Sequence, residues 1–320
     1  MPFFGYNINK EDNNMEKVLV AAGFYDNQKK QLEQKFPQLQ FVYQDDVNAD
    51  IIIGNYSVKK LKDFKNLKWI QLTAVGYDNY IKQGIFDHDV VITNSVDVHS
   101  VEVAEHIVGL LMTLLKKIYI YRDNQHQHIW HDEGKVKSIN GLRVCIVGFG
   151  DIGKALAKIL KGMGMYTIGV KRKPIEKPQY LDELYLQQDL DKAISDVDVV
   201  VSVLPGTSEN VHLFDRETFE KMKPDTIFIN AGRGNLVDSE VLYQVLADRV
   251  IACAGQDVFE QEPLPADSPL WTLDNLIVTP HVAGFFHLDS ALDRYLDLVI
   301  DNLQRYLDGE ELLNVVKERE

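Results

Sequence analysis

Residues 143–164, RVCIVGFGDIGKALAKILKGMG, place three glycines between an apolar run and an amphipathic helical pattern. The glycines are Gly148, Gly150 and Gly153, at the spacing of a dinucleotide-binding turn. The first permits a tight turn, the second lets a pyrophosphate approach the backbone, and the third lets helix and strand pack closely. Asp151 and Ile152 open the helix, whose first N–H groups can bind phosphate. This order predicts a strand–turn–helix unit of the Rossmann type.

The rest of the chain repeats the alternation of short apolar runs with helical patterns. The apolar runs are 17–22, 39–44, 49–54, 67–74, 142–148, 165–171, 197–205, 226–232, 251–258 and 276–282. Short strands that alternate with helices indicate βαβ units and a parallel sheet. We therefore expect an α/β fold, with a doubly wound parallel sheet over the last six runs.

Two longer helical patterns flank this region. Residues 98–122 read as one long helix that could bridge two domains, with apolar coverage that fits burial in a dimer. Residues 288–308 read as a final amphipathic helix, and the tail 311–316 is expected to return to the first domain.

Composition excludes several classes of partner. The 320 residues carry 34 Lys and Arg against 48 Asp and Glu, a formal charge of −14, which argues against nucleic-acid or anionic-membrane binding. No apolar run approaches the roughly 20 residues that span a bilayer. The first 14 residues are polar, are expected to be loose and do not resemble a signal peptide. Cys145 and Cys253 lie in separate apolar runs, which favours a reduced, cytoplasmic protein.

Three consecutive cations follow the second strand of the expected Rossmann sheet. Enzymes that bind NAD usually place Asp or Glu there, about 20 residues after the glycines, to bind the ribose 2′-hydroxyl. Here Lys171, Arg172 and Lys173 follow Val170, and the next carboxylate is Glu176. Because Arg binds phosphate with charge-assisted hydrogen bonds, this pattern predicts NADP, with NAD as second choice. A solvated basic turn is the alternative.

Reactive side chains follow three later strands. They are Arg233, then Asp257, Glu260 and Glu262, and finally His281. Ligands in open α/β sheets bind beyond the carboxyl ends of the strands, so these groups can converge. Reduction of a 2-keto acid needs a proton donor, which His281 can supply beside a carboxylate, and a cation for the substrate, which Arg233 can supply. Taken singly, each residue could instead be structural.

These motifs, in this order, resemble the D-isomer-specific 2-hydroxyacid dehydrogenase family and look like those of its glyoxylate/hydroxypyruvate reductases. The matching pieces are LTAVGYDN, VGFGDIG, LPGTSENVHLFD, MKPDTIFINAGRGNLVD, DVFEQEPLP and PHVAG. The resemblance implies a Rossmann domain, residues 96–287, inserted in a smaller flavodoxin-like α/β substrate domain, residues 1–95 plus 288–320. It also implies a homodimer.

The resemblance also assigns roles to residues. Arg233, Glu262 and His281 would be catalytic, with Glu262 paired to His281. Asp257 would hold the nicotinamide amide, and the remaining expected cofactor contacts are Leu204, Pro205, Thr207, Ala231, Gly232 and Gly284. The N–H groups of Val75 and Gly76 would bind the substrate carboxylate, beside Arg233 and His281.

The sequence also allows two alternative functions. The alternatives are an NAD-linked D-lactate or D-2-hydroxyisocaproate dehydrogenase, and a cofactor-sensing binding protein like the co-repressors of this fold.

Residues 126–131, HQHIWH, contain three histidines, but their spacing does not form a tight ligand set, so we expect no metal. Trp130 is expected to pack at the domain junction. Departures from the family pattern, such as Glu102 in place of a small hydroxyl residue, leave the substrate open.

Overall fold

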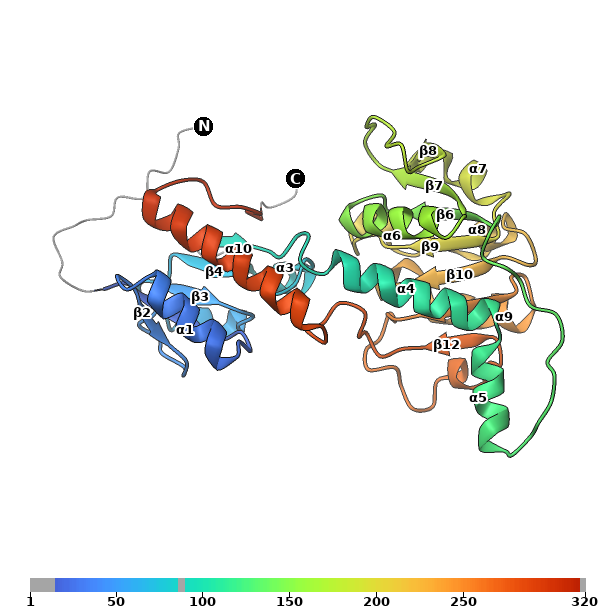
Figure 1. Ribbon diagram of the computed structural model, residues 1–320, viewed down its shortest axis with the longest axis horizontal. Coiled ribbons are helices and arrows are strands. Elements are labelled where there is room, and N and C mark those ends of the chain that lie inside the picture. The colour runs from blue at the N-terminus through green and yellow to red at the C-terminus, as the bar shows by residue number, and fades with distance from the viewer. Residues whose placement is uncertain (1–14, 86–89, 317–320) are drawn as a thin grey trace. The chain divides into compact units, whose positions relative to one another are not determined.

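The computed structural model describes residues 15–85 and 90–316, and it divides the chain into two compact units (Figure 1). One unit, here the discontinuous unit, combines Met1–His99 with Phe286–Glu320. The other, the central unit, is Ser100–Phe285. The expectation for residues 1–14 lies outside the described residues.

The discontinuous unit is a five-stranded parallel sheet covered by helices. Its elements are β1 (Lys17–Val20), α1 (Asp26–Lys35), β2 (Gln40–Val42), β3 (Ile51–Ile53), α2 (Val58–Leu61), β4 (Trp69–Gln71), α3 (Asp78–Lys82), β5 (Val91–Thr93) and α10 (Asp289–Asp308). The strand order β2-β1-β3-β4-β5 is the flavodoxin order, as the resemblance implied. Sequence reasoning missed β5, because it is a three-residue edge strand.

Apolar side chains fill both faces of this first sheet. Val18, Val20, Ile51 and Ile53 pack on one face beneath α1 and α10. Leu19, Ile52, Ile70 and Ile92 point to the opposite face, where α2 contributes Val58 and Leu61. Because side chains alternate along a strand, each short strand serves both layers, which explains the unbroken apolar run Ile51–Ile53.

The tail at 311–316 returns to this sheet, which confirms the prediction for it. Thr93 and Val315 form an antiparallel bridge, and Val316 N donates to Ile92 O at 2.8 Å. A buried amide on α10 joins tail and sheet. Asn302 Nδ2 donates to Gln71 Oε1 at 2.9 Å, and Leu313 N donates to Asn302 Oδ1 at 2.7 Å.

The central unit is a seven-stranded parallel sheet. Its strands and longer helices are α4 (Ser100–Leu115), α5 (Ile118–His126), β6 (Arg143–Val147), α6 (Asp151–Gly162), β7 (Tyr166–Lys171), β8 (Glu183–Leu186), α7 (Leu190–Ile194), β9 (Val199–Ser202), α8 (Arg216–Glu220), β10 (Ile227–Asn230), α9 (Ser239–Ala247), β11 (Cys253–Gln256) and β12 (Leu276–Val278). Short 3₁₀ turns occupy Gln187–Asp189, Ser208–Asn210, Gly234–Leu236 and Pro269–Thr272.

The strand order β12-β11-β10-β9-β6-β7-β8 is the Rossmann order with one added strand, which confirms the predicted doubly wound sheet. All six predicted runs contain a strand, and sequence reasoning missed β8. This strand pairs with β7 at the sheet edge and is half-buried throughout, so its sequence, ELYL, lacks the apolar run of the inner strands.

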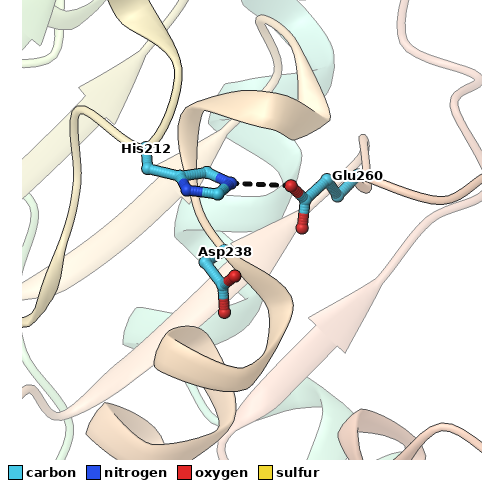
Figure 2. A group of neighbouring side chains, drawn as sticks. All are labelled: His212, Asp238 and Glu260. Carbon is cyan, nitrogen blue, oxygen red and sulfur yellow. Dashed lines mark hydrogen bonds and ion pairs between the residues drawn. The ribbon is translucent and has the colours of Figure 1, made fainter.

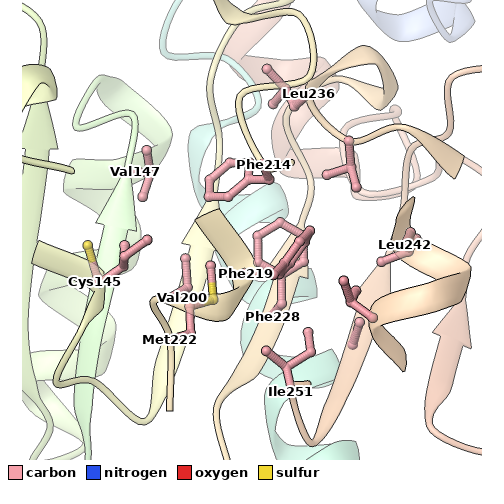
Figure 3. Packing of buried hydrophobic residues seen from close by; sticks show 14 of the residues in the cluster. Cys145, Val147, Val200, Phe214, Phe219, Met222, Phe228, Leu236, Leu242 and Ile251 are labelled. Atoms are coloured by element: carbon pink, nitrogen blue, oxygen red, sulfur yellow. The ribbon is translucent and has the colours of Figure 1, made fainter. Parts of the chain in front are cut away.

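Helices cover both faces of the central sheet. α4 and α6 pack on one face, over Val144, Ile146 and the matching residues of β9 and β10. α7, α8 and α9 pack on the other face, around an aromatic cluster shown in Figure 3. Within that cluster the rings of Phe214 and Phe228 lie 4.9 Å apart. The inner strands β9 and β10 are therefore fully buried, which gives their ends a rigid support.

Two sequence expectations in the 98–131 region are wrong. The single helix over 98–122 is divided into α4 and α5, because Lys117 adopts a left-handed backbone with φ 55°. Side chains of Lys116 and Lys117 donate to backbone carbonyls of residues 137 and 133, which stabilises the break. Trp130 does not pack at a domain junction: its side chain is fully exposed.

Both cysteines are free thiols. Cys145 is buried in β6, and Cys253 is half-buried at the start of β11. Burial raises the pKa of both thiols, that of Cys253 to about 12, so neither has the thiolate character of a reactive cysteine. Among the helices in the described ranges, none is both long enough and apolar enough to cross a membrane.

The buried amide of α10 gives a prediction about stability. Replacing Asn302 with Ala removes the partner of Leu313 N and one of the two donors to Gln71 Oε1, so we expect it to lower the free energy of unfolding by about 2–4 kcal/mol. Gln304→Ala, on the exposed face of the same helix, is the control and should change it by less than about 0.5 kcal/mol. Chemical denaturation measures both. Equal effects would contradict the role given to Asn302.

Candidate active site

The glycine turn between β6 and α6 has the geometry of a phosphate cradle. Gly148 has φ +104°, and a Cβ there would meet Val203 backbone atoms at 2.9 Å. A Cβ on Gly153 would meet Gly148 O at 2.6 Å, so glycine is needed for close packing. A Cβ on Gly150 would meet nothing within 4 Å, which leaves open space before the first N–H groups of α6, including those of Asp151 and Ile152.

The three cations at the end of β7 have different surroundings. Lys171 Nζ donates to Phe149 O at 3.1 Å, so this lysine braces the glycine turn. Arg172 is exposed and forms an ion pair with Glu209 at 3.4 Å, from the 3₁₀ turn Ser208–Asn210 after β9. Lys173 is exposed. A carboxylate from a different strand end therefore lies beside Arg172, which the sequence alone could not indicate.

The loops after β10 and β11 lie against each other. A Cβ on Gly234 would meet Phe259 C and O at 1.9 Å, so the turn that carries Arg233 lies directly on the turn that carries Glu260 and Glu262. Arg233 is half-buried, and its Nη1 donates to Gly232 O at 2.8 Å. Because β10, β11 and β12 are parallel neighbours, their carboxyl ends meet at one edge of the sheet.

Glu262 and His281 form the ion pair that the sequence predicts. Glu262 Oε2 lies 2.7 Å from His281 Nδ1, and the other oxygen, Oε1, accepts from Phe259 N at 2.9 Å. A carboxylate only accepts, so Nδ1 carries the hydrogen and donates it. His281 Nε2 makes no hydrogen bond within the described part of the chain. The second nitrogen is therefore available to exchange a proton with a bound molecule.

The buried carboxylate of Asp257, 1% exposed, holds the loop that carries His281. Its Oδ1 accepts from Val282 N at 3.0 Å and from Thr279 Oγ1 at 2.6 Å, while Oδ2 accepts from Ala283 N at 3.1 Å. Its backbone oxygen accepts from His281 N at 2.7 Å. His281 has φ 54°, an unusual conformation for a non-glycine residue, and these bonds maintain it.

A second histidine joins this network. His106, on α4, lies with Nε2 3.0 Å from Thr279 Oγ1 and 3.5 Å from Asp257 Oδ1. The sequence analysis missed both His106 and Thr279. Thr279 stands two residues before His281 in TPHVAG, which could have signalled it, but His106 lies in a helix with no local signal.

The other expected contacts lie in several loops. Leu204, Pro205 and Thr207 follow β9, Ala231 and Gly232 follow β10, and Gly284 follows His281. A Cβ on Gly232 would meet Leu204 O at 2.6 Å, so the first two loops touch. Val75 and Gly76 belong to the discontinuous unit, and their part in a substrate site stays a prediction.

Three features thus adjoin the carboxyl edge of one sheet: a phosphate cradle, a proton-donating imidazole oriented by a carboxylate, and a half-buried guanidinium. A nucleotide phosphate, a developing negative charge on oxygen and a substrate carboxylate are the chemical groups that such a set can bind or protonate.

Known proteins resemble this chain over more than half of its length. A sequence model of the family described as "D-isomer specific 2-hydroxyacid dehydrogenase, NAD binding domain" matches residues 108–283. A glyoxylate reductase from Korarchaeum cryptofilum is 32% identical over 261 residues, which are 79% of this chain and 76% of that protein.

Solved structures superpose over almost the whole chain. A D-isomer specific 2-hydroxyacid dehydrogenase family protein from Aeromonas salmonicida gives a TM-score of 0.86 at 31% identity, over 95% of this chain and 99% of that chain. An NADPH-dependent glyoxylate/hydroxypyruvate reductase from Sinorhizobium meliloti, in complex with NADP and sulfate, gives 0.80 at 25% identity, over 94% and 98%.

The Asp257 network leads to a prediction that separates positioning from cofactor binding. In Asp257→Asn, the Nδ2 group cannot accept a hydrogen bond, so an N–H group of the 279–283 loop loses its partner and His281 shifts. We expect kcat to fall about 100-fold, with the cofactor Kd changed by less than about threefold, within 0.7 kcal/mol. Steady-state kinetics and fluorescence titration measure the two quantities.

Asp274→Asn, which changes an exposed carboxylate paired with Arg249, is the control and should leave both unchanged. Loss of cofactor affinity in Asp257→Asn with unchanged kcat would instead support the role in nicotinamide binding that the resemblance implied.

Proposed function

Since the chain belongs to the D-isomer specific 2-hydroxyacid dehydrogenase family, we propose that it reduces small 2-keto acids to D-2-hydroxy acids with NADPH. Members of this family are NAD(P)-dependent oxidoreductases that act on CH–OH groups, and this chain is one of them. The single observation that carries the proposal is the Glu262–His281 pair at the edge of the Rossmann sheet.

The residues around the glycine turn fit a dinucleotide. The open space at Gly150 and the N-terminus of α6 would receive the pyrophosphate, with Asp151, Ile152 and Gly153 in the first helical turn. The loops with Leu204, Pro205 and Thr207 and with Ala231 and Gly232 would flank the adenosine and nicotinamide parts, with Gly284 beyond His281. When bound, the nicotinamide supplies the hydride that reduces the substrate carbonyl carbon.

His281 is the acid in this proposal. Its Nε2 would donate a proton to the carbonyl oxygen as negative charge develops there, while Nδ1–H remains hydrogen-bonded to Glu262. The carboxylate keeps the imidazole ring oriented. In the reverse direction the neutral Nε2 would accept the hydroxyl proton.

Arg233 is the cation for the substrate. Its guanidinium presents planar, paired donors that suit a carboxylate and a neighbouring carbonyl oxygen. Its half-buried position strengthens that interaction, because less water competes. The N–H groups of Val75 and Gly76 remain predicted partners of the same substrate carboxylate.

The cofactor preference depends on Arg172 and its partner. Arg172 would bind the 2′-phosphate, and Lys171 keeps the adjacent glycine turn in place. Glu209 competes for the same guanidinium, so phosphate binding requires Arg172 to exchange one anion for another. The exchange is favourable because a 2′-phosphate carries more charge than a carboxylate. The Sinorhizobium meliloti reductase, a relative by structure, is NADPH-dependent.

A homodimer is part of the proposal. α5 contains no buried residue, and exposed apolar side chains on it and after it are Ile118, Tyr121, Ile129, Trp130 and Val136. Apolar side chains gathered on one helix and the segment beyond it are typical of a protein interface. A cytoplasmic location stays a prediction from cysteine usage.

The proposal predicts a specific loss of chemistry in His281→Asn. We expect kcat with glyoxylate, hydroxypyruvate or 2-ketoisocaproate to fall about 10²–10⁴-fold, because the proton donor is removed. NADPH affinity should stay nearly unchanged, since the ring binds substrate and not the phosphates. His126→Asn on α5 is the matched control. An absorbance assay at saturating cofactor measures kcat, and a fluorimetric NADPH titration measures the cofactor affinity.

Two outcomes would redirect the proposal. If the wild-type protein binds NADPH but turns over none of the 2-keto acids, it is a cofactor-sensing binding protein. If it turns over lactate or 2-hydroxyisocaproate with NAD and ignores NADPH, it is the NAD-linked dehydrogenase.

The cation pattern gives a second prediction. Arg172→Ala should lower kcat/KM for NADPH about 10- to 100-fold, the value of one or two charge-assisted hydrogen bonds, and change that for NADH by less than about threefold. Glu209→Gln should raise kcat/KM for NADPH, because it removes the competing carboxylate. Glu217→Gln, an exposed acid on α8, is the control. An equal loss with both cofactors in Arg172→Ala would refute this selectivity.

A further inference from the structure

Three side chains with metal-binding atoms converge outside the proposed active site (Figure 2). They come from three neighbouring strand ends: His212 from the loop after β9, Asp238 from the loop after β10, and Glu260 from the loop after β11. One ligand atom from each lies within 4.8 Å of the other two. The residues are far apart in the sequence, so no spacing motif reveals them.

Each ligand is partly held in place. Asp238 is the N-cap of α9, where its Oδ1 accepts from Glu240 N at 2.9 Å and from Val241 N at 3.0 Å. Its Oδ2 accepts no hydrogen bond within the described ranges. His212 Nε2 lies 2.7 Å from Glu260 Oε1, and His212 N donates to Asn235 O at 2.8 Å.

Negative charge at the cluster is not balanced by a basic side chain. Of the described residues, no Lys or Arg forms an ion pair with Asp238 or Glu260, and His212 is the partner of Glu260. A cavity of about 310 Å³ adjoins both carboxylates. Its other lining residues are Ser239, Glu240, Ser268 and Pro269, so the lining adds a third carboxylate and two hydroxyls but no cation. Such a cavity attracts a cation.

We propose that His212, Asp238 and Glu260 bind a divalent transition-metal ion, with Zn²⁺ as the ion that their chemistry suits best. One imidazole nitrogen and two carboxylate oxygens are common zinc ligands, whereas Mg²⁺ and Ca²⁺ prefer oxygen alone. Binding replaces the His212–Glu260 hydrogen bond with bonds of about 2.0–2.2 Å to the ion. The side chains are partly exposed, so they can close around it and leave a position for water.

The ion would link the loops after β9, β10 and β11. Glu260 stands two residues before Glu262 in the same turn, and Gly234 already packs that turn against the loop after β10. Occupancy therefore stabilises the turn that carries Glu262. The site uses none of the residues assigned to cofactor or substrate, so metal binding can be tested independently of the proposed reaction.

The test is a titration of chelator-treated, dialysed protein with ZnCl₂ by isothermal calorimetry, with Tm followed by scanning calorimetry. We expect one equivalent of Zn²⁺ to bind and Tm to rise with zinc concentration. His212→Asn should weaken binding at least about 10-fold, by loss of the imidazole. Asp238→Asn is the second variant: Asn caps a helix as well as Asp, so the fold is preserved while a charged ligand is lost.

The histidine-rich segment supplies the matched control. His131→Asn removes an exposed imidazole from HQHIWH and should leave zinc affinity unchanged. Titration with Co²⁺ adds a readout of coordination by its visible absorption spectrum, which His212→Asn should change. The proposal is overturned if wild type and His212→Asn bind Zn²⁺ equally, if only His131→Asn loses binding, or if no equivalent binds.

Discussion

The buried carboxylate of Asp257, at the end of β11, is the interaction on which the candidate active site depends. Burying a charge is costly unless several donors surround it. Here the donors are backbone N–H groups and a hydroxyl from the 279–283 loop. Donors of the loop therefore stabilise the buried carboxylate, and the carboxylate in turn holds the loop in its conformation. The end of β11 positions Asp257, and the loop bound to Asp257 positions His281. Glu262 then orients the imidazole ring of His281.

Glycines let the loops at this edge pack closely against each other. A Cβ on Gly232 or on Gly234 would overlap the backbone of the adjoining loop. The loops after β9, β10 and β11 thus lie in van der Waals contact, and each presents its polar side chains from a fixed base. This arrangement explains why Arg233 and the cluster of His212, Asp238 and Glu260 both form at the same edge although their residues are distant in sequence.

The three cations at the end of β7 do not share one environment. Lys171 serves the backbone of the glycine turn, while Arg172 is exposed and already paired with Glu209. An exposed ion pair contributes little to stability. It does, however, hold the guanidinium beside the 3₁₀ turn Ser208–Asn210 that follows β9. The three cations, equivalent in the sequence, therefore have unequal roles.

Sequence patterns are enough to predict the glycine turn, all the inner strands, the return of the tail and, through the family resemblance, the pairing of Glu262 with His281. These depend on periodicity and on motifs whose residues or strand contexts are contiguous. The folded structure is needed to find six other features: the break at Lys117, the edge strands β5 and β8, the exposure of Trp130, the Asp257 network with His106, the ion pair of Arg172 with Glu209, and the His212 cluster. Each of these depends on contacts between segments far apart in the chain, or on whether a neighbour covers a side chain, and local sequence carries no record of either.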